Sequence, residues 1–516
     1  MKRWFDANSR LWMILLVAAC SLFLFPLFRE GFFISDDGEW MVIRLSAFYQ
    51  SLAEGQFPVR FLGRLNNSYG YPVANFLYPG FLYIGSLLHA AGLSFVESIK
   101  AILGASIIGT TIVLYRLLRH YQHRRLTAAA GVLGFLFSPY IVYDLYRRGS
   151  VGEILAFFPA SLVFYSIAAG KRLLLPFAVG FLIVSHNTVA LITLAAAFAF
   201  IVYRRQWEYV WWCALGIALA SFFWIPALRE QSYVLFNSVA VSDPFVYFPV
   251  SLDLIAASWV WIVAAILLVG QKRLRDENFW LILLISCVLL ATPVLQLFWQ
   301  TPLLSRLVQF PYRFLGLAAL AAPIVVAGSL GAVGRKKTIV SFLYVAAWIV
   351  FAVRIAGSID PIIREEGFYT TNEGTTTVAN EYMPVWVREL PASRATNRIE
   401  IVSGDAEFSI AKATTQSIDV TVESQTETVV QINTVYYPGW GIIVDGQPVN
   451  IDYGNPQGLM RVTVPTGSHR IIAEFRETVS RFAADAVSFL AAIVYGIILA
   501  AGMLTGPKNK KKKRTR

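Results

Sequence analysis

Long apolar runs, separated by short polar segments, occupy most of this chain of 516 residues. A helix needs about 20 mostly apolar residues to cross the hydrocarbon core of a bilayer, and most of the runs approach or reach that length. The pattern predicts a polytopic α-helical membrane protein. The apolar runs are 11–28, 77–92, 97–118, 126–143, 153–169, 173–187, 188–203, 208–227, 252–270, 278–297, 314–333, 338–356 and 482–504.

Basic residues between the runs predict how the chain is threaded, because Lys and Arg collect at the cytoplasmic ends of spans. Lys2, Arg3 and Arg10 place the N-terminus inside, and the tail Lys510–Arg514 places the C-terminus inside too. Two cytoplasmic ends require an even number of crossings. The internal basic clusters all lie on the cytoplasmic side if run 77–92 does not cross and only dips into the membrane from outside. We therefore expect about twelve transmembrane helices plus one re-entrant or juxtamembrane segment.

Segment 357–480 changes from helical to strand-like patterning. Apolar and polar residues alternate in Ser417–Val422, Val429–Asn433 and Arg461–Val464, a period that is typical of strands. Asp445-Gly446 lies between two further apolar stretches and indicates a hairpin turn. We expect an extracytoplasmic antiparallel β-sandwich before the last helix.

These patterns divide the chain into a membrane part and an outer part. The expected parts are a transmembrane domain 1–356 with a first outer loop 29–76, the β-sandwich domain 357–480, a C-terminal transmembrane helix 481–505 and a basic cytoplasmic tail 506–516.

Composition agrees with a multi-pass protein of the plasma (inner) membrane. The chain is 56% hydrophobic and 15% charged, whereas soluble proteins are about 25% charged. Much of the net charge of +12 lies in the tail, where contact with anionic membrane lipids explains it better than a nucleic-acid partner does. Cys20, Cys213 and Cys287 all lie in apolar runs, so neither disulfides nor a zinc site is expected.

The first outer loop contains the acidic stretch Ser35–Trp40, in which Asp36 and Asp37 are adjacent and Glu39 follows. Crowded carboxylates can hold a divalent cation such as Mg²⁺ or Mn²⁺, or keep a general base with a raised pKa. Alternatively, Ser35 or Asp36 caps a helix that starts near Asp37, and the acidic residues favour the positive end of the helix dipole. The two interpretations are compatible, because a capping Asp can also be a ligand.

Arginines in the outer segments are candidates for binding an anion. Arg60 and Arg64 have a four-residue spacing that would place both on one helix face, where they could hold a phosphate. Snorkelling toward lipid headgroups is the simpler alternative. Arg148 lies at another predicted outer boundary of the membrane, although positive residues usually gather at the cytoplasmic boundary. Glu153 follows it in the sequence. Ser150 and Glu153 also match a capping box.

Polar residues at membrane depth complete the candidate set. His186 and Asn187 interrupt two apolar runs, which is costly unless they face a polar cavity or make an interhelical hydrogen bond. Gln309 and Arg313 enter a helix from outside. These groups are predicted to gather with Asp36 and Asp37 at one end of the bundle, which is a functional-site hypothesis.

Several reaction types are disfavoured by missing motifs. The sequence contains no phosphate-binding Gly-rich loop, no HExxH, no GxSxG and no Cys/His metal spacing. An enzyme on the outer face also lacks a supply of nucleotides, so it would take activated groups from lipid carriers.

The chain resembles the bacterial YfhO-like membrane proteins and the 6-pyruvoyl-tetrahydropterin synthase-related membrane proteins, and through them the GT-C glycosyltransferase superfamily. The resemblance covers most of the chain. The motifs that carry it are Asp36-Asp37, Tyr146-x-Arg148-Gly149 with Glu153, Ser185-His186-Asn187, Gln309–Phe314, Glu381–Pro384 and Tyr437–Trp440 with Asp445-Gly446. Pterin chemistry itself is not expected, because the five histidines form no zinc-binding cluster in the sequence.

The resemblance implies transfer of a sugar from a polyprenyl-phosphate donor to a cell-envelope glycan or glycolipid at the extracytoplasmic face. It implies that Asp36 or Asp37 acts as the base or holds a cation, with Glu153 as a second acid. The motif is Asp-Asp rather than Asp-x-Asp, so the resemblance does not decide whether the site needs a divalent cation. The substrate-binding residues that it implies are Arg60, Arg64, Arg148, His186, Asn187, Gln309 and Arg313.

Two other functions use the same features. A transporter or flippase of lipid-linked or envelope glycans would use the buried polar groups as a passage, although no paired broken helices or inverted repeats are evident. A non-catalytic protein would bind envelope glycan through the sandwich alone.

Overall fold

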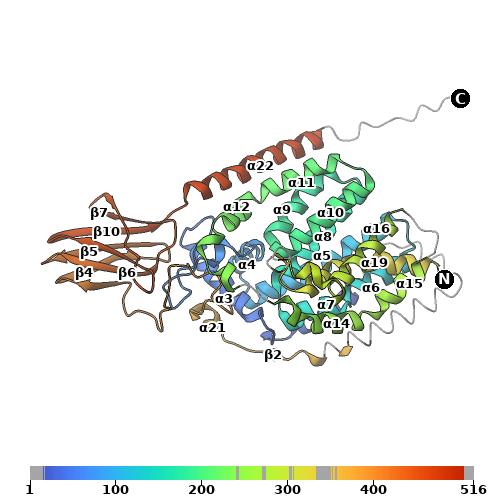
Figure 1. The fold of residues 1–516 in the computed structure, drawn as a ribbon, viewed down its shortest axis with the longest axis horizontal. Helices are drawn as coiled ribbons and strands as arrows, with labels where there is room; N and C mark the ends of the chain where they lie inside the picture. The colour runs from blue at the N-terminus through green and yellow to red at the C-terminus, as the bar shows by residue number, and fades with distance from the viewer. Residues whose placement is uncertain are drawn as a thin grey trace.

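The computed structural model describes residues 18–239, 243–269, 275–301, 307–332 and 357–504, and the single positions 16, 305, 350, 353 and 354. A helical bundle forms most of the molecule, and a group of β-strands lies at one end of it (Figure 1). Helix α22 begins beside the strands and runs back along the outside of the bundle (Figure 1).

Within the described residues, five helical segments are long and apolar enough to cross a membrane. Their apolar residues cover most of each helix surface, as expected when every face contacts lipid or other helices. The segments are Phe95–His120 (α5), Val151–Ala168 (α8), Asn187–Arg204 (α10), Pro311–Leu330 (η8 and most of α19) and Val479–Gly502 (in α22).

Four further spans are bent pairs of helices, which raises the number of candidate spans to as many as nine in the described chain. Pro139 and Pro293 stand at two of the breaks, where proline cannot continue the preceding helix. The pairs are Arg125–Leu136 with Pro139–Arg148 (46°), Glu208–Leu219 with Ser221–Arg229 (72°), Pro244–Ala257 with Trp259–Leu268 (60°) and Asp276–Leu290 with Pro293–Trp299 (80°).

Two apolar runs form shorter helices. Run 77–92 gives α4 (Gly80–Ala90), whose 11 residues span only about 16 Å, so it is too short to cross, as predicted. Run 173–187, expected to cross, gives only the short segment Arg172–Ser185. Most of run 338–356, and residues 11–15 and 17 of run 11–28, lie outside the described residues. The total of twelve crossings therefore stays a prediction.

The C-terminal strands form two antiparallel sheets, as the alternating pattern predicts. One sheet has the order β4-β5-β10-β7-β8 and the other β3-β6-β9. Asp445 and Gly446 both have positive φ and connect β7 to β8, with Val444 paired to Gln447, so the predicted hairpin is confirmed. The strands are Ile399–Ser403 (β3), Ala406–Ala413 (β4), Ser417–Ser424 (β5), Thr428–Val435 (β6), Trp440–Val444 (β7), Gln447–Val449 (β8), Leu459–Val464 (β9) and Gly467–Phe475 (β10).

The segment before these strands packs on the bundle rather than in the sheets. Pro361-Ile362 (β2) pairs with Phe32-Phe33 (β1) of the first outer loop, and α21 (Glu366–Thr371) lies against α3 (Gly38–Ala53). The strands of the sandwich begin only at Ile399, so the expected domain 357–480 includes a long linking segment.

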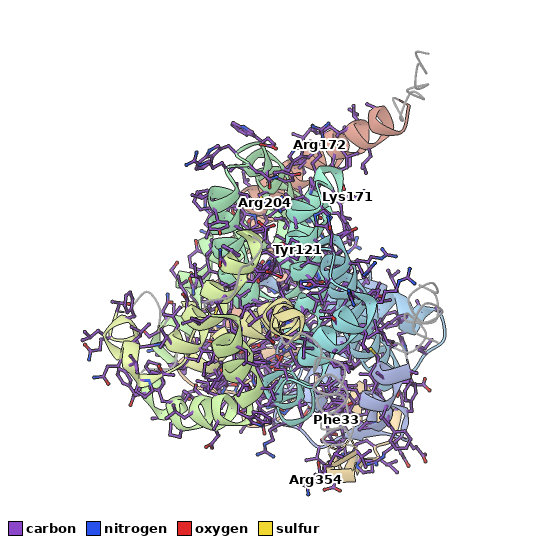
Figure 2. All side chains as sticks on the ribbon, turned by 90° about the vertical axis from the view of Figure 1, so that its right-hand side faces the viewer. Phe33, Tyr121, Lys171, Arg172, Arg204 and Arg354 are labelled. Atoms are coloured by element: carbon purple, nitrogen blue, oxygen red, sulfur yellow. The ribbon has the colours of Figure 1, made fainter. Side chains whose placement is uncertain are left out.

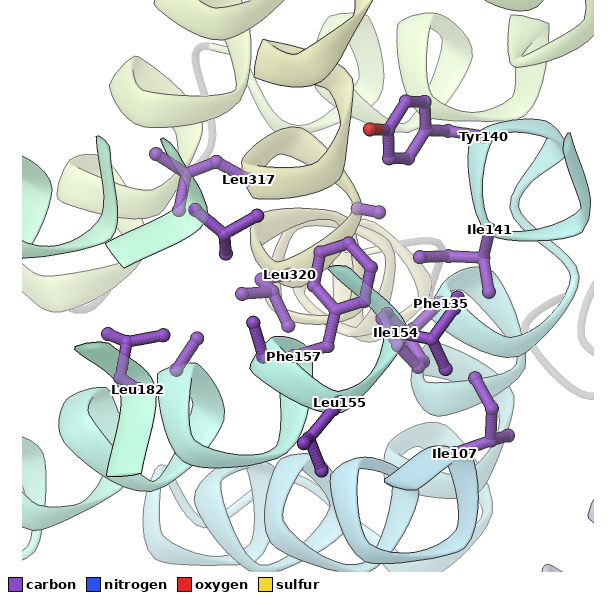
Figure 3. Close-up of a cluster of buried hydrophobic side chains, with 14 of the residues drawn as sticks. Ile107, Phe135, Tyr140, Ile141, Ile154, Leu155, Phe157, Leu182, Leu317 and Leu320 are labelled. Atoms are coloured by element: carbon purple, nitrogen blue, oxygen red, sulfur yellow. The ribbon is translucent and has the colours of Figure 1, made fainter. Parts of the chain in front are cut away.

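A continuous apolar core holds the bundle together. Figure 3 shows side chains from several helices meeting between α8 and α19, among them Phe157, Leu317 and Leu320. All three are buried. Tyr140 (on α7, Pro139–Val142) is drawn in the same view, and its hydroxyl donates to Glu153 Oε2 at 2.8 Å. The core therefore fixes the helix ends that carry the site described below.

The opposite end of the bundle carries the basic clusters. Figure 2 views the bundle from that side and labels Lys171, Arg172 and Arg204. Arg204 pairs with Asp276 at 3.0 Å. The structure contains no membrane, so the sidedness of both ends stays a prediction.

Candidate functional site

Asp36 and Asp37 are held in place by backbone hydrogen bonds to a second loop. The N–H groups of Asp36 and Asp37 donate to the carbonyls of Arg147 and Arg148 at 2.9 and 2.8 Å. Gly149 makes this approach possible: its φ is +67°, and a Cβ there would lie 2.6 Å from Ser35 Oγ. Two loops more than a hundred residues apart in sequence are therefore joined at the start of α3.

Glu153, in the first turn of α8, is the centre of a buried polar cluster. Its carboxylate is fully buried and accepts hydrogen bonds from Arg148 Nη1 at 2.9 Å and from Arg313 Nε at 2.9 Å. The hydroxyl of Tyr140 donates to Oε2 at 2.8 Å, and Nε2 of His186 lies 3.6 Å from Oε1. The predicted gathering of Arg148, Glu153, His186 and Arg313 is thus what the structure shows.

Further contacts fix the two arginines. Arg148 Nη1 also binds Asp144 Oδ1 at 2.5 Å, across a π-helical turn formed by Tyr143–Arg148. Such turns are frequent at functional sites because they re-aim side chains. Arg313 Nη1 donates to Gln309 Oε1 at 3.0 Å and to the carbonyl of Val308 at 2.8 Å. Two guanidiniums therefore balance two carboxylates.

Asp37 differs from Glu153 because its carboxyl has no hydrogen bond or ion pair within the described chain. It is half-buried, and burial raises the pKa of Asp37, opposed by the positive charges of Arg148, Arg44 and Arg313. A carboxylate that is partly desolvated and unpaired is suited to take a proton. This is the property predicted for a general base in the acidic stretch.

Arg44 is a site residue that the sequence interpretation missed. It lies two turns after Asp37 on α3 and is buried, with bonds to Thr376 (Nε to Oγ1, 3.2 Å, and Nη2 to the carbonyl, 2.6 Å). No carboxylate in the described chain forms an ion pair with it. The signal in the sequence was a lone charge within the apolar stretch of α3, at the i, i+7 spacing from Asp37.

Tyr78 connects the two halves of the site. Its ring centroid lies 4.5 Å from that of His186. Gly152 leaves room for the ring, because a Cβ there would lie 1.9 Å from Tyr78 Cε2. Burial raises the pKa of Tyr78, and the charges that act on it include Arg44, Glu153, Arg313 and Asp37. Tyr140, Asp144 and Tyr78 were also not among the predicted site residues.

The remaining predicted residues lie at the rim or elsewhere. Asp36 is exposed and lies 3.6 Å from Arg147. Asn187 Nδ2 donates to the carbonyl of Phe76 at 3.3 Å, and Gln309 supports Arg313. Their predicted roles stay predictions.

The expectation that Arg60 and Arg64 share a helix face is wrong. Residues 58–71 contain no helix: 63–69 are turns with positive φ at Asn66, Asn67 and Ser68, and Leu62 and Tyr71 form a bridge. Arg60 binds Glu477 at 3.0 Å and Asp485 at 2.9 Å, beside α22. Arg64 donates to the carbonyls of Tyr369, Thr370 and Ile43. Long-range partners, which local spacing does not reveal, determine both positions.

A cavity of about 730 Å³ opens beside the site and has an apolar wall and a charged rim. Leu24, Leu27 and Phe28 line it together with Ala101, Gly104, Ala105 and Ile108 of α5. Arg29, Lys100 and Arg364 also line it, and so do the carboxylates of Glu30, Glu97 and Glu366, so its charged groups are of both signs. Arg364 pairs with Glu39 at 3.3 Å in the first turn of α3. The apolar wall of this groove suits a lipid chain.

Comparisons with solved structures identify similar folds. One is the arabinofuranosyltransferase AftD from Mycobacteria, with a TM-score of 0.50 and 17% identity over 68% of this chain. Another is ArnT from Cupriavidus metallidurans bound to undecaprenyl phosphate, with a TM-score of 0.43 and 14% identity over 70% of this chain and 68% of that chain. No family model matches the sequence, and no curated protein matches it.

The AftD likeness shows that the chain shares a fold with part of a membrane glycosyltransferase. The chain spans only 27% of the AftD chain, so activity, substrates and partners of that protein do not transfer with the fold. The narrower resemblance to YfhO-like and 6-pyruvoyl-tetrahydropterin synthase-related proteins stays a prediction.

Proposed function

We propose that the protein transfers a sugar from a polyprenyl-phosphate donor to a hydroxyl of a cell-envelope glycan or glycolipid. The observation that carries the proposal is the half-buried, unpaired carboxyl of Asp37 beside three buried arginines, Arg44, Arg148 and Arg313. The fold shared with part of a glycosyltransferase supports it.

Asp37 would act as the general base. Its carboxylate takes the proton of the acceptor hydroxyl while the hydroxyl oxygen forms a bond to the anomeric carbon of the donor sugar. The bond between that carbon and the phosphate oxygen breaks, and its electron pair leaves with the lipid phosphate. A positioned base typically contributes about 10²–10⁴-fold to the rate.

The arginines would stabilise the negative charge that develops on the leaving phosphate. Guanidiniums suit this role because they bind phosphate oxygens in a fixed, bidentate geometry. Arg148 and Arg313 are already oriented by Glu153, so little reorganisation accompanies charge development. Arg44 lacks a carboxylate partner within the described chain and has charge available for a ligand. His186 would contact the sugar or the phosphate.

The groove beside α5 would admit the donor lipid from the bilayer. Its apolar wall fits a prenyl chain, and Arg364, one of the charged residues that line it, pairs with Glu39, two residues from Asp37. This arrangement agrees with a multi-pass protein of the plasma membrane whose site and sandwich lie outside and whose termini are cytoplasmic.

Asp36 and Asp37 would also be the place for a divalent cation. Mg²⁺ often uses one or two carboxylates and completes its coordination with water and substrate phosphate. The described chain contains no group of three or more His, Cys, Asp or Glu residues that could hold a metal ion, so the pair would need those additional oxygens. When bound, the cation would neutralise phosphate charge. Loss of transfer on chelation, with recovery on adding Mg²⁺, tests this role.

Proteoliposomes holding the purified protein, a radiolabelled polyprenyl-phosphate sugar and an envelope glycolipid extract test the proposed function. Glycosyl transfer predicts that label moves from the donor into a product that survives mild acid, because the phosphate-linked sugar is acid-labile and a glycoside is stable. Movement of the intact donor across the bilayer without a new product would contradict it and favour a flippase.

A further inference from the structure

A polar groove of about 440 Å³ lies between the C-terminal end of α3 and the sandwich. Gln50 and Glu54 of α3 form one wall, and Thr414 and Thr415, next to β4, form another. Glu54 Oε2 accepts a bond from Thr415 Oγ1 at 2.6 Å, which joins the two walls. The groove is open, and no apolar side chain larger than alanine lines it.

Two arginines in this groove form no direct ion pair with any residue that the structure describes, although Glu373 acts electrostatically on Arg64 and Glu54 on Arg398. Arg64 and Arg398 are largely buried, and within the described chain neither has a carboxylate within ion-pair distance. Their bonds go to neutral groups, such as the carbonyl of Ser68, which accepts from Arg398 at 2.8 Å. Burial lowers the pKa of Arg64 to about 10 and also lowers the pKa of Arg398.

A third arginine stands at the mouth of the groove. Arg394 is mostly exposed and binds Glu373 at 3.0 Å. Because Glu373 and Glu54 already bind Arg394 and Thr415, the groove has a surplus of guanidinium donors over carboxylate acceptors. Three arginines thus face two glutamates, and because partly desolvated cations with too little counter-charge are costly, an anionic ligand would stabilise this arrangement.

A smaller cavity adjoins the groove on the other side of Arg394 and Arg398. Amide side chains of Asn67, Asn397 and Asn433 and the ring of Tyr69 line it. Its volume of about 50 Å³ admits a single substituent rather than a sugar ring, and the amides of Asn67 and Asn433 already donate to the carbonyls of Pro391 and Asn397. The groove of about 440 Å³ is therefore the part large enough for a saccharide, and the small cavity extends it.

We propose that these joined cavities bind an acidic saccharide, with its carboxylate or phosphate ester held by Arg394, Arg398 and Arg64. The cavities lie toward the C-terminal end of α3, and this helix of 16 residues is about 24 Å long, so the ligand binds well away from Asp37. The identification of this saccharide as the acceptor, anchored at a distance from its reacting hydroxyl, rests on the proposed function. The binding of the saccharide does not depend on the proposed function.

Calorimetric titration of the full-length protein in detergent tests the proposal. The probes are a trigalacturonate, a neutral trisaccharide of similar size and inorganic phosphate. The variants are Arg394→Gln and Arg398→Gln, with Arg470→Gln as the matched control, because Arg470 is an exposed, paired arginine in the same domain. Asp37→Asn separates this binding from transfer, and its trigalacturonate affinity is expected to match that of the parent.

The parent and Arg470→Gln are expected to bind trigalacturonate at least tenfold more tightly than either the neutral sugar or phosphate. Arg394→Gln is expected to weaken binding about tenfold or more, since a bond to a charged group is lost. Its exposed side chain leaves folding intact, which a melting temperature equal to that of the parent checks. Unchanged affinity in folded Arg394→Gln would overturn the proposal. So would equal binding of the neutral trisaccharide, or phosphate binding as tight as that of the saccharide.

Discussion

At the scale of single residues, two acidic groups in one pocket have opposite surroundings. Glu153 accepts bonds from Arg148, Arg313 and Tyr140, whereas Asp37 has no bonded partner in the described chain. Carboxylates whose environments differ in this way often divide the roles in a site. We interpret Glu153 as the group that positions the arginines and Asp37 as the base.

This division predicts different effects on stability. Glu153→Gln leaves Arg148 and Arg313 buried with less counter-charge, and removing one partner of a buried pair costs about 3–5 kcal/mol. Asp37→Asn removes a partly desolvated charge and is expected to leave the free energy of unfolding unchanged or slightly higher. Thermal unfolding of both variants in one detergent measures this. A melting temperature that falls more for Asp37→Asn than for Glu153→Gln would contradict the assignment.

The raised pKa of Asp37 predicts a pH dependence of transfer. The base must be ionised, so kcat/KM is expected to fall as pH drops through a value above the ordinary range of an aspartate. The contribution of Asp37 to the stability of the fold depends on pH in the opposite direction. A raised folded-state pKa favours the protonated form, so the contribution of Asp37 to stability is present at low pH and lost as pH rises through that pKa. A pH–rate profile with its acidic limb at or below the ordinary range would contradict this.

At the scale of elements, the site depends on the contact between the loop before α3 and the loop before α8. Gly149→Ala places a Cβ 2.6 Å from Ser35 Oγ at a backbone φ of +67°. We expect at least a tenfold loss of transfer, because the shift moves Asp37 away from the arginines.

Gly170→Ala is the matched control for this change. Its φ of +69° imposes the same backbone strain, but its nearest neighbour would be Tyr209 Oη at 3.9 Å. Transfer by the two variants is measured against their melting temperatures. Equal activity in both would show that the loop contact does not position the base.

Local pattern predicts some of these elements and fails for others. The break between α9 (Leu175–Ser185) and α10 follows from His186 and Asn187 within an apolar stretch, and the hairpin follows from Asp445-Gly446. The turns around Arg64 could not be predicted, because that side chain binds carbonyls about 300 residues away. The burial of Arg44 likewise depends on Thr376.

At the scale of the whole molecule, one buried carboxylate joins the bundle, the sandwich and the last helix. Glu230, after α12 (Ser221–Arg229), accepts two bonds from Arg481 of α22, at 2.8 and 2.7 Å. Tyr437 of the sandwich donates to it at 2.7 Å, and Asn75 of the first outer loop at 2.9 Å. The position of the sandwich is therefore fixed by charge as well as by apolar contact.

Glu230→Gln is expected to destabilise the whole molecule by about 3–5 kcal/mol, because Arg481 stays buried without its counter-charge. Glu477→Gln is the control, since Arg60 keeps its pair with Asp485. Protease cleavage between the sandwich and the bundle, followed in both variants, measures the effect. Equal resistance would show that Glu230 does not hold the junction.

The architecture was predictable where it depends on composition and local spacing. It was less predictable where it depends on contacts between residues that are distant in the sequence. Apolar runs identify the spans, and alternation identifies the strands. The gathering of Arg148, Glu153, His186 and Arg313 could be inferred because each lies at an end of an apolar run, and the predicted threading places those ends on one face. The bends within four spans and the distant site of Arg60 follow from packing, which no local pattern records.

The claim that Asp37 is the base of a sugar transfer is tested most directly by comparing Asp37→Asn with Asp36→Asn. The two residues are adjacent, but Asp36 is exposed and faces Arg147, whereas Asp37 faces the buried arginines. Initial rates are measured with a polyprenyl-phosphate sugar and an envelope glycolipid. We predict that Asp37→Asn slows transfer at least 100-fold, and that Asp36→Asn, which removes at most one of the two carboxylate ligands of a cation, slows it far less. Equal rates in the two variants would contradict the account.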